Sequence, residues 1–211
     1  MPTDMTFRTD DLVLGSWAHV GRVWTSGEPF LVLDASLLAA WRGSEEQFEE
    51  VVSLGWEVAT VRVGNGVAGI VATDGTVNDE GWLEIFQAGP DRLAVVQALG
   101  NPYRRALRDA LAYPDEADDD GGVFAVPSGD LVLWSSALDG IDDVGAELRR
   151  AEPGPTPDAW EPLHGGAPHH PGGLQIPLCA GTFRLRVRWM TELDDACFAR
   201  WLLTHQPARR L

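Results

Sequence analysis

The chain contains no lysine, and its charge is strongly unbalanced. All 16 of its basic residues are arginines, against 32 aspartates and glutamates, so the formal net charge of the 211 residues is −16. Nucleic-acid-binding proteins need a basic face, and anionic membrane surfaces attract basic segments. We therefore expect neither a nucleic-acid nor a membrane partner. The excess of acid is consistent with solubility alone, or with an acidic face that attracts a basic protein.

Long apolar runs and cysteines are also scarce. No stretch approaches the 18 or so apolar residues of a membrane helix. The first residues carry acids where a signal peptide would carry basic and then apolar residues, so we expect a cytoplasmic protein. Two cysteines, Cys179 and Cys197, are too few for a disulfide framework or a zinc site. Free thiols are expected in a reducing compartment, although a bridge between them is geometrically possible.

Short apolar runs between Gly, Pro, Asp and Ser predict a β-rich protein of the α+β class with a few short helices. Asn65-Gly66 lies between two β-branched runs and predicts a hairpin. Helices are expected at 44–53, at 91–99, and at 101–113, with Asn101 as cap. Near the C-terminus, 183–189 alternates apolar residues with arginines, which predicts a half-buried strand whose arginines pair with carboxylates. Residues 197–204 are expected to return as its partner strand, with a helix as the alternative.

The segment 115–122, DEADDDGG, concentrates acid and glycine and predicts an exposed linker. The pattern then repeats, because Ser128-Gly129 followed by Leu-Val-Leu matches Ser26-Gly27 followed by Leu-Val-Leu. We therefore expect two related antiparallel β units, 1–114 and 123–211, joined by this linker. The two units could share one core.

Three of the five histidines, His164, His169 and His170, lie within seven residues and are the weak candidates for a metal site. Metal ligands usually occupy fixed positions on a helix, a strand or a tight knuckle, whereas these lie in a Gly/Pro-rich loop. No cofactor is expected. The G-x-G-x-x-G match at 64–69 falls in the predicted hairpin and not between a strand and a helix. The acids from Glu116 do not complete a calcium loop. No G-x-S-x-G elbow is present, so no catalytic residue is identified.

Two features are candidates for partner binding. The first is the acidic segment, through Asp115, Glu116, Asp118, Asp119 and Asp120. The second is Trp160, which stands in a polar, proline-rich stretch, whereas most of the nine tryptophans fall in core-like patterns.

A recognisable series of motifs runs through the first ninety residues. It consists of Trp24 to Leu33, then Ser36-Leu37-Leu38 and Trp41-Arg42-Gly43, followed by an acidic helical segment and the VGNG hairpin. In these motifs the chain resembles the immunity protein 21 family of bacterial polymorphic toxin systems. The chain departs from the family's Gly-Gly before proline with Gly27-Glu28. The resemblance implies an α+β fold and inhibition of a cognate toxin, with no catalytic residues to transfer.

The function expected from the sequence is non-catalytic binding of a protein, plausibly a basic toxin domain. One alternative is a β domain that binds a small molecule or a carbohydrate through exposed tryptophans. The other is a metal-dependent enzyme that uses His164, His169 and His170.

Overall fold

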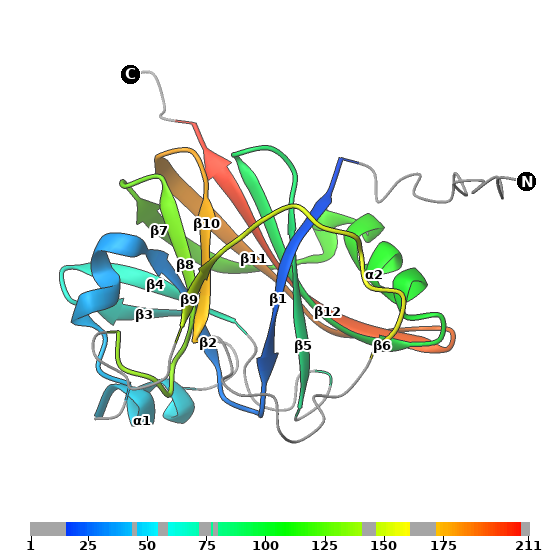
Figure 1. Cartoon of the computed structure of the whole chain (residues 1–211), viewed down its shortest axis with the longest axis horizontal. Coiled ribbons are helices and arrows are strands. Elements are labelled where there is room, and N and C mark those ends of the chain that lie inside the picture. The colour runs from blue at the N-terminus through cyan, green and yellow to red at the C-terminus, as the bar shows by residue number, and fades with distance from the viewer. Residues whose placement is uncertain are drawn as a thin grey trace, which may run out of the picture.

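The computed structural model describes residues 16–43, 46–54, 59–71, 77, 80–140, 147–160 and 172–207. Within these residues two six-stranded sheets pack face to face (Figure 1). Sheet A has the order β1 (Ala18–Thr25), β5 (Gly81–Gln87), β6 (Arg92–Gly100), β12 (Ala196–Gln206), β11 (Gly181–Leu193), β7 (Asp119–Val126). Sheet B has the order β3 (Thr60–Val63), β4 (Gly66–Val71), β2 (Phe30–Asp34), β8 (Asp130–Ser135), β10 (Gly173–Pro177), β9 (Leu148–Arg150). The predicted β-rich α+β class is confirmed.

Helices cover the outer faces of both sheets. The 3-10 helix η2 (Ala35–Ala40) and α1 (Glu46–Ser53) lie on sheet B, where Val51 and the fully buried Trp41 join an apolar cluster with β2, β4 and β8. The helix α2 (Tyr103–Ala112) packs across β6 and β12 of sheet A. Its buried residues recur at helical spacing and contact the outward-facing side of these strands. The buried residues of α2 are Tyr103, Ala106, Leu107, Ala110 and Leu111.

The core between the sheets comes from alternate residues of each strand. On β11, Phe183, Leu185 and Val187 point inward and are at most 1% exposed. The arginines between them face outward, as a strand with one solvated face requires. Each large apolar side chain buried in this way contributes about 1.5–3 kcal/mol. The half-buried strand predicted from the alternation is confirmed, and so is its partner strand, β12.

The two halves of the chain repeat one pattern of six strands. In sheet A, β1-β5-β6 is followed by β12-β11-β7, and in sheet B, β3-β4-β2 is followed by β8-β10-β9. Each strand of the first half therefore has a counterpart, numbered six higher, at the mirrored position of the same sheet. Strands β1–β6 thus correspond to β7–β12 around a pseudo-two-fold axis. At the centre of sheet B, Val32 of β2 lies opposite Leu133 of β8, and Leu33 lies opposite Val132. The repeated Leu-Val-Leu sequences therefore pair with each other at the axis. The edges depart from the symmetry, because β9 runs parallel to β10 whereas β3 is antiparallel to β4.

A buried carboxylate joins the two halves near the axis. Asp34 is fully buried, and its two oxygens accept hydrogen bonds from Ser36 and from the backbone and hydroxyl of Ser128. Burial opposes ionisation, but these hydrogen bonds outweigh it and hold the pKa of Asp34 below its ordinary value of 3.8. These bonds hold the Ser128-Gly129 turn of the second half against the end of β2 in the first half.

The helix expected at 91–99 is wrong, because this segment is the strand β6. Leu93 and Val95 face the core between the sheets, while Ala94 and Val96 face α2. A strand buried on both faces shows no polar alternation, so its apolar run is compatible with a helix until the layers are known. The hairpin expected at Asn65-Gly66 is confirmed, but its two connecting residues are Gly64 and Asn65, with Gly64 at φ 56°.

The expectation of an exposed linker at 115–122 is also wrong. This segment contains the 3-10 helix η3 (Asp115–Ala117) and the first residues of β7, which pairs with β11. Arginines of the neighbouring strands pair with Asp115, Asp118 and Asp120, so like-charge repulsion does not keep the segment extended in solvent. Each sheet contains strands of both halves, and residues of both halves form the core between the sheets. The two halves therefore share one core, the alternative that the sequence left undecided.

Other details of the elements differ from expectation. Pro102, not Asn101, occupies the N-cap position of α2 and makes no side-chain capping bond. The proposed cap of α1, residue 44, lies outside the described residues. Cys179 and Cys197 are both free thiols, so the bridge between them is not formed. Burial raises the pKa of the Cys197 thiol, which disfavours its thiolate form.

Candidate functional site

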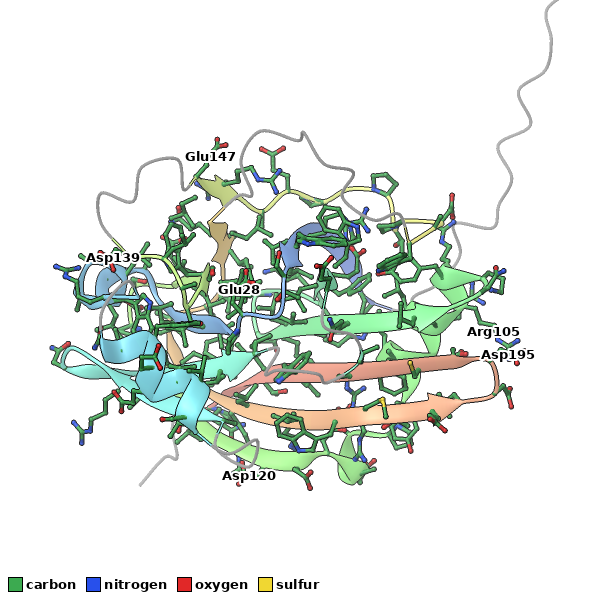
Figure 2. All side chains as sticks on the ribbon, turned by 90° about the horizontal axis from the view of Figure 1, so that it is seen from below. Glu28, Arg105, Asp120, Asp139, Glu147 and Asp195 are labelled. Carbon is green, nitrogen blue, oxygen red and sulfur yellow. The ribbon has the colours of Figure 1, made fainter. Side chains whose placement is uncertain are left out.

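The acidic residues proposed for partner binding lie between α2 and β7, along the outer face of sheet A. Figure 2 shows Asp120 at the margin of the molecule. The facing strand β11 presents Arg184, Arg186 and Arg188, so carboxylates and guanidinium groups meet across one sheet surface. The predicted pairing of this arginine-faced strand with neighbouring carboxylates is confirmed.

Asp118 and Arg200 form the buried centre of this region. Together with Arg188 and Asp115 they make up what we call the Asp118 cluster. The Arg200 side chain is 1% exposed, and its Nη2 lies 2.6 Å from Asp118 Oδ2 and 3.2 Å from Asp115 Oδ1. Arg200 Nη1 donates to the carbonyls of Ala110 and Tyr113. Arg188 Nε binds the other oxygen of Asp118 at 3.0 Å. Asp118 therefore holds the fold together and has no free oxygen for a partner.

The remaining acids of the segment differ in their availability. Asp115 is also engaged, by Arg200 and by Arg92 at 3.1 Å. Asp120 makes a looser pair with Arg184 at 3.6 Å, and both side chains stay substantially exposed. Exposed pairs of this kind contribute little to stability. Asp119 and Glu116 are exposed. The surface that a partner can reach is therefore formed by Glu116, Asp119 and Asp120.

Trp160 is partly buried and does not project freely from the surface. Its ring centroid lies 6.2 Å from that of Trp24, and it packs beside the apolar cluster under α2. An ion pair between Arg104 and Asp158, at 3.1 Å, connects the preceding residues to α2. Trp160 thus helps to fix the segment 151–160 on the outer face of sheet A, which is the packing role that most of the tryptophans were expected to play.

The sequence-based metal candidates, His164, His169 and His170, lie outside the described residues. Among the described residues, no group of three or more His, Cys, Asp or Glu side chains is arranged to hold a metal ion. The same residues contain no helix long and apolar enough to cross a membrane.

A second ionic cluster was not anticipated from the sequence. Glu84 of β5 is fully buried, and we call it, with His19, Arg22 and Tyr103, the Glu84 cluster. Its Oε2 lies 2.8 Å from His19 Nε2, while Oε1 accepts from Arg22 Nη2 at 2.7 Å and from the Tyr103 hydroxyl at 3.0 Å. In the sequence, Glu84 looks like one acid among many. The pairing of β1 with β5 brings His19, Arg22 and Glu84 together, and the packing of α2 on the outer face of sheet A adds Tyr103.

Aromatic rings enclose the exposed side of the Glu84 cluster. The Arg22 guanidinium lies 3.9 Å from the centroid of the Trp82 ring, a cation–π contact. Trp82 in turn meets Trp24 edge to face at 5.1 Å. Because Arg22 covers one face of Trp82, that face is not available for stacking on a sugar ring. The contact therefore weighs against the carbohydrate-binding alternative at this position.

Both oxygens of the Glu84 carboxylate have a neighbouring polar side chain. Oε1 accepts from Arg22 and from the Tyr103 hydroxyl, and Oε2 lies within hydrogen-bond distance of His19 Nε2. Burial, with the Glu84 carboxylate beside it, raises the pKa of the Tyr103 phenol above its ordinary value of 10.0. Tyr103 therefore stays a neutral hydrogen-bond donor at physiological pH.

A shallow depression lies between the start of α2 and the β11–β12 turn. Its volume is about 20 Å³, and Arg105, Asp109 and Asp194 are among the lining residues. Figure 2 shows Arg105 and Asp195 side by side at this end of the molecule. Ligand pockets usually measure about 300–1,000 Å³, and 20 Å³ is roughly the space of one water molecule. This depression is not a substrate site.

Comparisons with known proteins supply no relative. No protein-family model matches the chain, and neither a curated protein nor a solved structure does so. The resemblance to the immunity protein 21 family therefore stays a prediction, and the geometry carries the functional argument.

Proposed function

We propose that this protein is a non-catalytic binding module that neutralises a cognate toxin by occupying its basic surface. The observation that carries the proposal is the division of charge between the interior and the surface. Arginines neutralise the buried carboxylates of Asp118 and Glu84, so the solvent-facing charge is largely acid.

The two ionic clusters show this division directly. Arg200 and Arg188 are committed to Asp118, and Arg22 is committed to Glu84. Exposed carboxylates outnumber exposed guanidinium groups among the described residues. The exposed carboxylates belong to Glu49, Glu50, Glu80, Asp91, Glu116, Asp119, Asp120, Glu147, Glu152, Asp158, Glu192, Asp194 and Asp195, and the exposed arginines are Arg62, Arg105, Arg108, Arg149 and Arg150.

A surface of this sign attracts a basic protein and speeds its association. An inhibitor needs no catalytic group, since it acts by covering the active site of its target. The acidic barstar and the basic nuclease barnase are a worked case of this principle among well-studied complexes. The resemblance of the first ninety residues to an immunity family supports the same function.

The test is binding and rescue with defined toxin domains. The full chain would be co-expressed with each basic toxin-like domain encoded next to its gene, and complexes would be measured by calorimetry. We expect one domain to bind with one-to-one stoichiometry, and the chain to restore growth of cells that express it. Binding of a glycan or metabolite by the chain, with no complex formed by any of these domains, would contradict the proposal.

A further inference from the structure

The two outer strands of sheet A, β1 and β7, are equivalent in the pseudo-two-fold repeat but differ in what covers them. The chain itself covers the free edge of β1. Gly154 N donates to His19 O at 2.9 Å, and Glu152 N donates to Val20 O at 3.0 Å. Ala151 N continues the contact to Gln175 O of β10. Figure 1 shows this segment, in yellow, running over β1.

The equivalent strand β7 has a partner on one side only among the described residues. It pairs with β11 from Val126 to Asp119, and no other described strand pairs with it. Apart from this ladder, the Val126 carbonyl accepts from Gly129 N in the turn that follows the strand. An open strand edge presents backbone donors and acceptors to any chain that can add a further strand. At residues 120–122 the ladder is irregular, and Asp120 accepts a hydrogen bond from Gly122 N. The regular part of the edge therefore runs from Val123 to Val126.

The side chains of β7 indicate the kind of strand that fits. Phe124 and Val126 point into the core, while Val123 is 50% exposed, one of the large apolar side chains that the fold leaves in solvent. Asp119, Asp120 and the nearby Glu116 add three exposed carboxylates at the start of the strand. An incoming strand would thus place an apolar residue against Val123 and basic residues beside the carboxylates.

We infer that β7 is the docking edge, and that the partner adds a basic β-strand to it. This inference rests on the proposed function and specifies the surface that performs it. Charge decides the occupant: a second copy of a chain with net charge −16 would bring acid to acid, whereas a strand rich in arginine or lysine is complementary. The inference also explains why the repeat is asymmetric, since the edge of β1 is already occupied.

A synthetic peptide tests the edge with the full-length chain. The probe has the eight-residue length of β7, alternates arginine with valine, and is blocked at both ends. Backbone hydrogen exchange is measured with and without saturating peptide. We expect amides of β7 to exchange about tenfold more slowly in the complex, because paired edge amides are withdrawn from solvent. The control peptide has the same charge, with proline in place of each valine, and cannot form a strand.

Two matched variants complete the test. Val123→Lys on β7 and Val52→Lys on α1 replace valines of similar exposure, 50% and 45%, and change the net charge equally. Val123→Lys is expected to weaken binding of the arginine–valine peptide by about tenfold, since it places a like charge against a basic strand. Val52→Lys should change the affinity far less.

The outcomes separate the inference from the proposed function. Equal protection of β7 by the proline peptide, or protection confined to other elements, would overturn the strand-addition inference. Protection of β7 that grows with protein concentration and without peptide would identify a second copy as the occupant and would also overturn it. If a basic toxin domain binds but β7 stays unprotected, the docking edge is wrong while the proposed function stands. If β7 pairs with the peptide but no toxin domain binds, the toxin function is wrong.

Discussion

Two ionic clusters lie at opposite ends of α2 on the outer face of sheet A, and they are organised with opposite charges at their centres. The Asp118 cluster surrounds a buried cation, because the Arg200 side chain is 1% exposed and is fixed by two carboxylates and two carbonyls. The Glu84 cluster surrounds a buried anion, whose cationic partner Arg22 is 27% exposed. Both side chains of the Arg200–Asp118 pair are buried, whereas the Arg22–Glu84 pair keeps a connection to solvent through Arg22.

This difference separates the carboxylates that stabilise the fold from those that only face solvent. Removing one partner of a sealed pair leaves a charge without solvent, which is more costly than the pair is worth. When its counter-ion is removed, a partly exposed side chain can instead rotate into solvent and be hydrated. The two clusters should therefore respond differently to equivalent substitutions, and the surface acids of β7 should respond least in stability.

The largest effect on stability is expected for Asp118→Asn. The substitution leaves the Arg200 guanidinium, which cannot be deprotonated, without its 2.6 Å counter-charge inside the protein. We expect a loss of about 3–5 kcal/mol in the free energy of unfolding. Urea denaturation measures it. A loss below that of Glu84→Gln would show that Asp115 alone can neutralise Arg200.

A smaller effect is expected for Glu84→Gln, at about 2 kcal/mol. The amide keeps one acceptor for the Tyr103 hydroxyl, and the Arg22 side chain can reach water. The same urea experiment gives the value. The comparison of the two clusters fails if this variant is the more damaging of the two.

Tyr103→Phe should cost still less at neutral pH, about 1 kcal/mol, because it removes one hydrogen bond to Glu84. Its distinctive effect is on the pH dependence. The pKa of Tyr103 is raised in the folded state, so its contribution is fully present below the unfolded pKa of about 10 and is lost as pH rises above that value. The free energy of unfolding of the wild type should therefore fall more steeply above pH 10 than that of the variant. Parallel curves would show that the phenol is not coupled to Glu84.

The smallest effect on stability is expected for Asp119→Asn with Asp120→Asn. Both side chains are exposed, so the free energy of unfolding should change by no more than about 0.5 kcal/mol. Association with a basic partner should become slower and less dependent on salt. Stopped-flow mixing at several salt concentrations measures both. Glu49→Gln with Glu50→Gln, on α1, removes the same charge far along the chain and serves as the control. An equal slowing in the control would mean that net charge, and not β7, steers the partner.

The sequence predicted the elements whose pattern is local. The alternation of Phe183 to Trp189 marks a strand, and the β-branched runs around Gly64 mark a hairpin. It failed at 91–99, because Val95 and Val96 face two different apolar layers and the segment has no polar face. It also failed at the acidic segment, because Arg200, which neutralises Asp118, lies 82 residues away along the chain.

The candidate site, too, could be predicted from the sequence only where its pattern is local. The acidic segment could be singled out by composition, but the separation of buried Asp118 from exposed Asp119 depends on the pairing of β7 with β11. The Glu84 cluster could not be found, since its members are scattered over β1, β5 and α2. The repeated Ser-Gly and Leu-Val-Leu sequences indicated related halves, and the strand order extends that likeness to all twelve strands.

The association of the full chain with a basic toxin domain, followed as a function of salt, tests the central claim most directly. We expect a one-to-one complex whose association rate falls as salt screens the acidic surface, while the dissociation rate changes much less. An association rate that does not depend on salt, or the absence of any complex with such domains, would contradict it.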